Sequence, residues 1–515
     1  MSSILTNTSA MVALQSMKSI NKNLNTTQSH ISTGKAVSTA KDNAAVWAIS
    51  KVMESDVAGF KGIGDSLSLG SSTISVARKA AETVTGLLTE IKGKVVAAQE
   101  ENVDRNKIQT DIVALRDQIA SVVGAAQFNG QNMIKGTDDM KVLASLDRSG
   151  DRNVTASSIT VERQDLTTGA GKFGIGTADV ASYGTITAPG GTVGTTGTTT
   201  AAAGKAAEVT FGAPAAANDV YTINVKGNTL NFTAAGAETA DQIRDHFTGA
   251  INALGLKGVT AAANGSGVME ISNTNAFESV SVSLASTVDA NLEMTDINGS
   301  GAAPTAPNVA TIEQRAETID FSTTAGVKDG DSFKVNVGSQ SFDYIAGKGE
   351  SMEDVVKGLK IAIDSNPPAG VTTSVSKDAT TGAWSLSVDD ATGGRTLALH
   401  VAKDGEASGG LFGLDNIDVT TADGAKSALA NVETMINRSI DSAAAFGSAQ
   451  KRIEIQNDFV SDLSDALKAG IGSMVDANME ETAARLQALQ VQQQLGTQAL
   501  SIANQAPQNV LALFR

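Results

Sequence analysis

The chain has 515 residues, of which 41% are hydrophobic, and this length and composition predict about three or four folded domains with apolar cores. The 39 basic and 55 acidic residues give a net charge of −16, which argues against nucleic-acid binding because phosphate neutralisation needs a basic surface. Cysteine is absent, which excludes disulfides and thiolate metal sites. No apolar run is long enough for a secretory leader or a membrane span, so neither is expected.

The first 40 residues carry a weak heptad pattern. Met17, Ile20, Leu24 and Ile31 share one helical face, while Ser, Thr, Asn and Gln fill most of the remaining positions. A helix of this length with a polar gap such as Thr27 buries too little apolar surface to offset about 1–2 kcal/mol of backbone entropy per residue. We therefore expect this helix to fold only against a partner.

A stronger heptad pattern begins at Ile74. Apolar residues alternate at spacings of three and four as far as Ala98, which is typical of a coiled-coil seam, and the alternation resumes from Ile108 to Val122. Asp104 lies between the two runs and is suited to N-cap the second helix, so a helical hairpin is predicted. The seam positions expected to form the core of a helical rod here are Ile74, Val84, Leu88, Ile91, Val95, Ile112, Leu115 and Ile119.

The pattern then changes to strict alternation of apolar and polar residues. Between residues 142 and 161 this alternation predicts a β-hairpin, with the turn-rich residues 148–151 at its centre. A low-complexity run of Gly, Thr and Ala at residues 188–204 indicates a linker or exposed loop. We interpret that run as a domain boundary.

Two stretches in the middle of the chain resemble each other at a constant offset of 112 residues, as from Tyr221 to Phe333. Each stretch reads as a strand, a tight turn, a second strand, a short helix and further strands. The repeat predicts two duplicated α+β modules, at residues 205–300 and 310–414.

The last part of the chain returns to heptads. From Leu429 to Met474 apolar residues hold two heptad positions for over six repeats, and a weaker pattern continues towards the end. Because the weak patterns lie at opposite ends of the sequence, the two ends must meet, and we favour burial of their seam by other copies of the chain. The further rod positions are Val432, Ile436, Phe446 and Ile453, and the terminal seam positions are Leu486, Leu489, Leu500 and Ala503.

Three motifs in this order resemble bacterial flagellin. Residues 31–49 (ISTGKAVSTAKDNAAVWAI) look like the stretch after the family's first helix, and residues 492–515 (QQQLGTQALSIANQAPQNVLALFR) are similar to its terminal helix. Together they mark a resemblance over roughly the first 180 and last 100 residues. The family's turn motif is matched by Gln127, Phe128, Asn129 and Gly130.

The resemblance implies a multidomain α+β fold. Its first and last helices would pair as an antiparallel coiled coil, giving a polymerisation domain from residues 1–40 and 471–515. Residues 41–185 and 415–470 would form a helical rod with the β-hairpin, and the two duplicated modules would point outward. The outer modules resemble those of flagellins and hook-associated proteins.

The implied function is a structural subunit of the bacterial flagellar filament, exported unfolded through the type III apparatus and polymerised outside the cell for swimming. The implied partners are other copies of the chain, sister flagellins, the filament cap, the hook-filament junction proteins and an export chaperone. We expect no cofactor, no nucleic acid and no membrane partner. Flagellins detected by the animal Toll-like receptor carry Gln-Arg and then Leu where this chain has Thr89-Glu90 and Lys94, so poor receptor recognition is expected.

Enzymatic chemistry has little support in the sequence. His30, His246 and His400 are isolated, so neither a catalytic nor a metal site is predicted. Residues 169–174 match the pattern GxGxxG but lack a following βαβ unit, and we interpret them as a flexible loop. Acidic pairs such as Asp389-Asp390 are interpreted as solvated surface.

Two alternative functions stay open from the sequence. A hook-filament junction or cap protein would share the terminal heptads and the outer modules, whereas a secreted adhesin would carry its function in those modules. The abundance of the protein in sheared extracellular material separates a filament subunit from a junction protein. The effect of removing the outer modules on polymer formation separates it from an adhesin.

Overall fold

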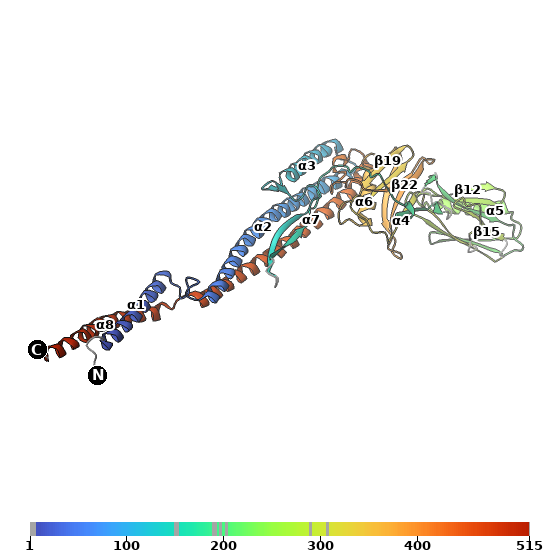
Figure 1. The fold of residues 1–515 in the computed structure, drawn as a ribbon. Helices are drawn as coiled ribbons and strands as arrows, with labels where there is room; N and C mark the ends of the chain where they lie inside the picture. Colours follow the sequence, from blue (N-terminus) through green and yellow to red (C-terminus); the bar gives the residue numbers. More distant parts are fainter. Residues whose placement is uncertain are drawn as a thin grey trace. The chain divides into compact units, whose positions relative to one another are not determined.

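The computed structural model describes residues 7–148, 154–187, 193–194, 198–200, 204–287, 291–304 and 308–513. The chain forms two compact units (Figure 1). The first is built from Met1–Ile74, Asp139–Val161 and Ser448–Arg515, and the second from Ser75–Asp138 and Glu162–Gly447. Most of the predicted hairpin turn, most of the low-complexity run and the last two residues lie outside the described residues.

The first unit holds the two terminal helices, α1 (Thr8–Thr33) and α8 (Met479–Leu513), which lie side by side (Figure 1). The Asn7 side chain caps α1 by accepting a hydrogen bond from the Ala10 amide, and Gly34 ends the helix in the left-handed conformation. Beyond these ends, the Ala36 amide donates to the Val475 carbonyl at 2.7 Å. Backbone hydrogen bonds therefore join the two segments that connect the terminal helices to the rest of this unit.

Two long helices, α2 (Ala44–Ala98) and α7 (Ala422–Val475), contribute residues to both units. In the first unit they pack with the hairpin of β3 (Met140–Arg148) and β4 (Val154–Val161), which confirms the predicted β-hairpin. Gln456 of α7 donates to the Ala144 carbonyl at 2.9 Å.

In the second unit, α3 (Arg105–Ala125) follows α2 and completes the predicted helical hairpin. Asp104 caps α3 by accepting from the Lys107 amide, as its position predicted. A two-residue turn then joins β1 (Gln127–Phe128) to β2 (Gln131–Asn132). Its residues Asn129 and Gly130 have φ angles of 49° and 80°, the left-handed pair that this type of hairpin turn requires.

The first outer module contains two four-stranded antiparallel sheets and one helix around a single core. The sheet orders are β11-β10-β14-β16 and β12-β13-β9-β15. Side chains from both sheets and from α5 (Ala240–Ala253) share the core, with Tyr221, Phe247 and Ile271 fully buried. The strands are β9 (Lys205–Phe211), β10 (Val220–Val225), β11 (Asn228–Thr233), β12 (Val259–Gly265), β13 (Val268–Asn273), β14 (Val280–Ser286), β15 (Leu292–Ile297) and β16 (Val309–Ile312).

The second outer module repeats this plan. Its sheets have the orders β20-β21-β17-β6-β7 and β19-β18-β22-β5, with β8 also paired to β22, and α6 (Met352–Asp364) shares the core. The helix caps Thr239 of α5 and Ser351 of α6 are equivalent in the repeat, and the predicted order of strand, turn, strand, helix and strands is confirmed. The later strands are β17 (Glu317–Phe321), β18 (Ser332–Val337), β19 (Gln340–Ile345), β20 (Val371–Lys377), β21 (Trp384–Asp390) and β22 (Thr396–Lys403).

The second module takes strands from both sides of the first in sequence. Tyr183 of α4 (Val180–Tyr183) and Ile186 of β6 belong to its core, although the first module follows them along the chain. The first module is therefore inserted into the second, an arrangement that the constant offset did not indicate. The early strands are β5 (Gly176–Thr177), β6 (Gly184–Thr187), β7 (Val193–Gly194) and β8 (Thr198–Thr200).

One sequence interpretation is incomplete and another is wrong. The GxGxxG segment is irregular, as a loop would be, but it is anchored, because Lys172 pairs with Glu406 through two backbone hydrogen bonds of 2.9 Å. At Gly174 an added Cβ would lie 2.0 Å from the Lys403 carbonyl oxygen, so these glycines allow close backbone approach. Asp389 and Asp390 are buried, not solvated, and each forms an ion pair with an arginine.

Candidate self-assembly site

The terminal helices α1 and α8 form an antiparallel pair. The Asn7 side chain donates to the Ala503 carbonyl at 2.8 Å near one end, and the Gln493 side chain donates to Asn21 Oδ1 at 2.8 Å near the middle. These contacts join residues at opposite ends of the sequence, so each terminal helix packs on the other.

Within the pair, the predicted seam is only partly covered. Of its eight predicted residues Leu489 alone is buried, at 7% exposure, and the other seven are half-buried. Thr27 and Thr482 are buried in the same seam, and each hydroxyl donates to a carbonyl of its own helix, Asn23 and Asn478 respectively. Two helices alone therefore make a seam interrupted by polar residues. The half-buried positions are Met17, Ile20, Leu24, Ile31, Leu486, Leu500 and Ala503.

A second group of large apolar side chains on the same helices points away from the seam. We call this group the outward set, and each member is 46–69% exposed. Sequence reasoning missed it because it followed only one heptad phase, although the α8 members also recur at spacings of four and seven. The outward set consists of Met11, Val12, Leu14, Val491, Leu495 and Ile502.

The terminal pair carries very little charge. The carboxylates of the two helices are confined to Glu480 and Glu481 in the first turn of α8, and their Lys and Arg residues are Lys18, Lys22 and Arg485. The net charge of −16 is therefore carried by other parts of the chain. Copies that meet through this pair bring few like charges together, which favours close packing of many subunits.

The predicted rod residues are buried among the helices of their own units. Leu115 is the exception and is half-buried, while Val123, which the heptad reading did not include, is buried on the same helix. Of the positions tied to receptor recognition, Thr89 and Glu90 are exposed, and Lys94 forms an ion pair of 2.5 Å with Asp111. The hydrogen bond to Asp111 raises the pKa of Lys94 above its usual value. The other rod residues are Ile74, Val84, Leu88, Ile91, Val95, Ile112, Ile119, Val432, Ile436, Phe446 and Ile453.

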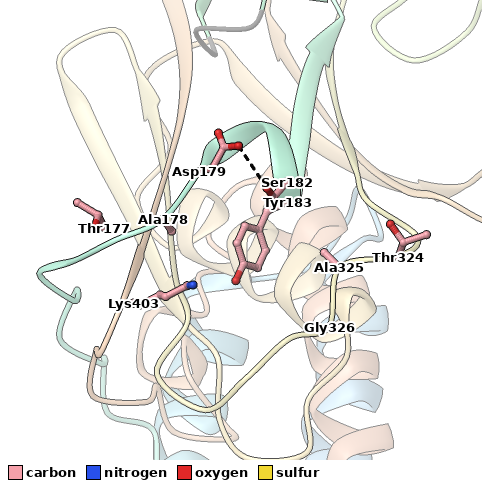
Figure 2. A pocket seen from close by; sticks show the side chains of 9 residues that line it. All are labelled: Thr177, Ala178, Asp179, Ser182, Tyr183, Thr324, Ala325, Gly326 and Lys403. Carbon is pink, nitrogen blue, oxygen red and sulfur yellow. Dashed lines mark hydrogen bonds between the residues drawn. The ribbon is translucent and has the colours of Figure 1, made fainter.

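Two polar hollows are alternative candidate sites. One, of about 260 Å³, lies between α1 and α8 and includes His30, Glu481 and Arg485. The other, of about 560 Å³, lies on the second outer module and is shown in Figure 2. Its residues are Thr177, Ala178, Asp179, Ser182, Tyr183, Thr324, Ala325, Gly326 and Lys403.

The hollow of Figure 2 lacks the arrangement of a catalytic site. Ser182 donates to Asp179 at 3.3 Å, but no histidine lies among the lining residues to act as its base. The Tyr183 hydroxyl donates to Asp331 at 3.4 Å, and burial raises the pKa of Tyr183. Across the described parts of the chain, no cluster of three or more His, Asp or Glu residues is arranged to hold a metal ion. The helices described also include none with an apolar stretch that could cross a membrane.

Comparison with known proteins gives matches at both ends of the chain. The model of the bacterial flagellin N-terminal helical region matches residues 4–139, and that of the C-terminal helical region matches residues 429–514. Flagellin A of Rhizobium meliloti is 30% identical over 523 residues, covering all of both chains. Flagellin FljK of Caulobacter vibrioides is 39% identical over 192 residues, covering 35% of this chain and 70% of that protein.

Solved structures of related flagellar proteins are more distant. A crystal structure of Xanthomonas campestris FlgL aligns with 82% of this chain and 99% of its own, at 10% identity and a TM-score of 0.30. The flagellar cap protein FliD from Escherichia coli aligns with 73% of this chain and 74% of its own, at 12% identity and a TM-score of 0.17.

Proposed function

The chain belongs to the bacterial flagellin family and is a structural subunit of the extracellular flagellar filament, and we propose that polymerisation buries two surfaces of its α1–α8 pair. The first surface is the half-open seam, and the second is the outward set. The single observation that carries this proposal is the exposure of 46–69% at all six residues of the outward set.

The energetic argument compares what one copy can bury with what several can. Fully burying a large apolar side chain contributes about 1.5–3 kcal/mol, so covering a side chain that is already half-buried contributes about 1 kcal/mol. Summed over the outward set and the seam, these contributions offset part of the conformational entropy that is lost when the two helices become ordered. Contacts between unlike surfaces of identical subunits extend into a helical filament when the rotation from one subunit to the next does not close a ring.

The same reasoning supports an assignment of domains. We assign residues 1–40 and 471–515 to polymerisation, and residues 415–470 with the segment from residue 41 to the rod. We place the end of that segment before β5 instead of at residue 185, because Tyr183 and Ile186 pack in the core of the second module. We place the first outer module at residues 205–312 instead of 205–300, because Ala310 and Ile312 pack in its core. We place the second at residues 176–200 and 317–414 instead of 310–414, because β5 to β8 pair within its sheets.

Membership of the family also supports finer partner assignments. We propose that the chain meets the filament cap, the hook-filament junction proteins and an export chaperone in addition to copies of itself and sister flagellins. We propose no catalytic role. His246 supports this view because its ring packs on Phe232, with centroids 4.9 Å apart, as a structural residue would.

Two substitutions in the seam test the proposal. Leu24→Asp and Leu489→Asp place a charge where neighbouring helices must exclude water, at a cost of several kcal/mol once the site is buried. We expect both variants to remain monomeric under conditions in which the parent forms filaments visible by electron microscopy. Circular dichroism should show that the rod and outer modules keep their structure.

A matched control separates the position from the charge. Gln490→Asp introduces the same charge at an exposed site on α8, on the side of the helix between the seam and the outward set. The control should polymerise far better than Leu489→Asp. Equal polymerisation of all three variants and the parent would contradict the proposal.

A further inference from the structure

The chain crosses between the two outer modules twice, and two charged residues meet where it does so. Lys205 is the first residue of β9, where the chain enters the first module, and Glu317 is the first residue of β17, where it has returned to the second. Lys205 Nζ lies 3.1 Å from Glu317 Oε1, and the two side chains are 2% and 1% exposed. The entry and exit of the inserted module are thus joined by a buried ion pair.

The residues just before Glu317 bind both modules. The Arg315 amide donates to the Asn275 carbonyl of the first module at 2.9 Å, and the Ala316 amide donates to the Ala276 carbonyl at 3.0 Å. On the other side, the Arg315 guanidinium donates twice to Asp389 of β21, at 2.7 and 2.8 Å. This short segment therefore orders the exit point against each module.

Asn273 adds two more hydrogen bonds at the same place. It pairs directly with Lys205 in the β13–β9 ladder and is fully buried. Its side chain donates to the Glu313 carbonyl at 3.0 Å and to the Glu278 carbonyl at 2.9 Å. The backbone leaving the first module is consequently fixed on the strand that lies beside the entering one.

A buried ion pair adds little to the free energy of unfolding, because the desolvation of two charges offsets their attraction and apolar residues of similar size are often as stabilising. The pair does resist a change in the angle between the modules, because such a change would separate two charges in a medium of low dielectric constant. An apolar pair tolerates such sliding much better.

We propose that the Lys205–Glu317 pair is a lock that fixes the angle between the two outer modules, so that they move as one rigid arm. This lock acts within a single subunit and does not depend on how subunits polymerise. Removal of both charges should loosen the angle while leaving each module folded on its own core.

The absence of cysteine from the chain makes the test direct. Ala262→Cys in the first module and Ala379→Cys in the second place single spin labels at exposed positions of the full-length monomer. Pulsed electron paramagnetic resonance then gives the distribution of distances between them. We expect a single narrow distribution in the parent.

Two variants of the lock and one control variant distinguish the angle between the modules from the folding of each module. Lys205→Met with Glu317→Leu should widen the distance distribution at least twofold without lowering the melting temperature of the modules. The swapped pair, Lys205→Glu with Glu317→Lys, should narrow it again. Lys226→Met, which removes the exposed ion pair with Glu278 in the first module, is the control and should leave the width unchanged.

Two results would overturn the lock. One is a broad distribution in the parent, and the other is an unchanged width in the double apolar variant. Filament formation by the same variants is recorded separately, so a failure of the lock is distinguishable from a failure of the proposed polymerisation surface.

Discussion

The first outer module and the terminal helix pair bury their apolar residues in different ways. In the outer module Tyr221, Phe247 and Ile271 are fully buried by the chain itself. In the α1–α8 pair, only Leu489 of the eight predicted seam residues is buried, and the outward set stays exposed. The middle of the chain therefore buries its own core, whereas we infer that its ends bury their remaining apolar residues against other copies.

Deletions give the largest expected effect on this comparison. A chain that lacks residues 482–515 should form no filaments, because α1 then has no partner helix. A chain that lacks residues 205–312 should polymerise, because the whole inserted module is removed between its entry and exit. The second deletion also carries Glu317→Gln, because the deletion removes Lys205, the buried ion-pair partner of Glu317.

The measurement is sedimentation followed by electron microscopy of the two shortened proteins. The comparison breaks if the shortened outer region prevents assembly or if the chain without α8 still assembles. An adhesin function in the outer modules would appear as loss of surface binding with filaments intact.

The next effect concerns the core of the first module. Phe247→Ala should lower the free energy of unfolding of this module by about 3–5 kcal/mol, because a fully buried aromatic ring leaves a cavity. Filament yield should stay near that of the parent. Thermal unfolding of the monomer checks the first statement, and electron microscopy checks the second. A loss of filaments with the module still folded would show that the two regions are not independent.

A smaller effect is expected at the start of α1. Asn7→Ala removes the helix cap and the 2.8 Å hydrogen bond to Ala503, at a cost of about 1–2 kcal/mol. Since α1 is ordered in the polymer, filaments of this variant should depolymerise at a lower temperature. The unfolding of the outer modules, followed in the monomer, should be unchanged. Filaments as heat-stable as the parent would contradict an ordered, capped α1 in the polymer.

Acid should also act differently on the two regions. Hydrogen bonds from the Ala235 amide and its neighbours lower the pKa of Glu238 below its usual 4.5, and a hydrogen bond from the Gly267 amide lowers that of Asp241 below its usual 3.8. Because a lowered native pKa stabilises the fold above the unfolded pKa, this contribution is lost as the pH falls through the native values. The first module should therefore lose stability below about pH 4.5.

Helix α1 and residues 482–513 of α8 contain no carboxylate, and Glu480 and Glu481 in the first turn of α8 are exposed, so we expect little such dependence in the helix pair. Circular dichroism of filaments and of monomers at pH 5 and pH 3 measures the difference. Equal stability of the first module at both pH values would contradict the assigned role of Glu238 and Asp241.

The sequence predicted those parts of the fold that depend on local periodicity. The heptads located α7 and the part of α2 from Ile74, but not the first 30 residues of α2, which begins at Ala44. Asp104 marked the start of α3, and the offset from Tyr221 to Phe333 identified the repeated modules. Each of these signals lies within a single element or recurs at one fixed spacing.

The features that could not be predicted depend on contacts between distant segments. The insertion of one module into the other involves β5 and β6, which are too short to show alternation. The burial of Asp389 depends on Arg315, which is 74 residues away. The outward set was not predicted for another reason. In the sequence of a helix with two apolar faces, one face reads as the heptad seam and the residues of the other read as scattered apolar residues.

Amide hydrogen exchange in the dilute monomer and in the filament tests the central claim most directly. We predict that the amides of Leu24 and Leu489 exchange rapidly in the monomer and are protected in the filament. Those of Phe247 and Val335, which lie in the cores of the outer modules, should be protected in both states. Strong protection of Leu24 and Leu489 in a dilute, monodisperse monomer would contradict the claim that other copies complete the terminal helix pair.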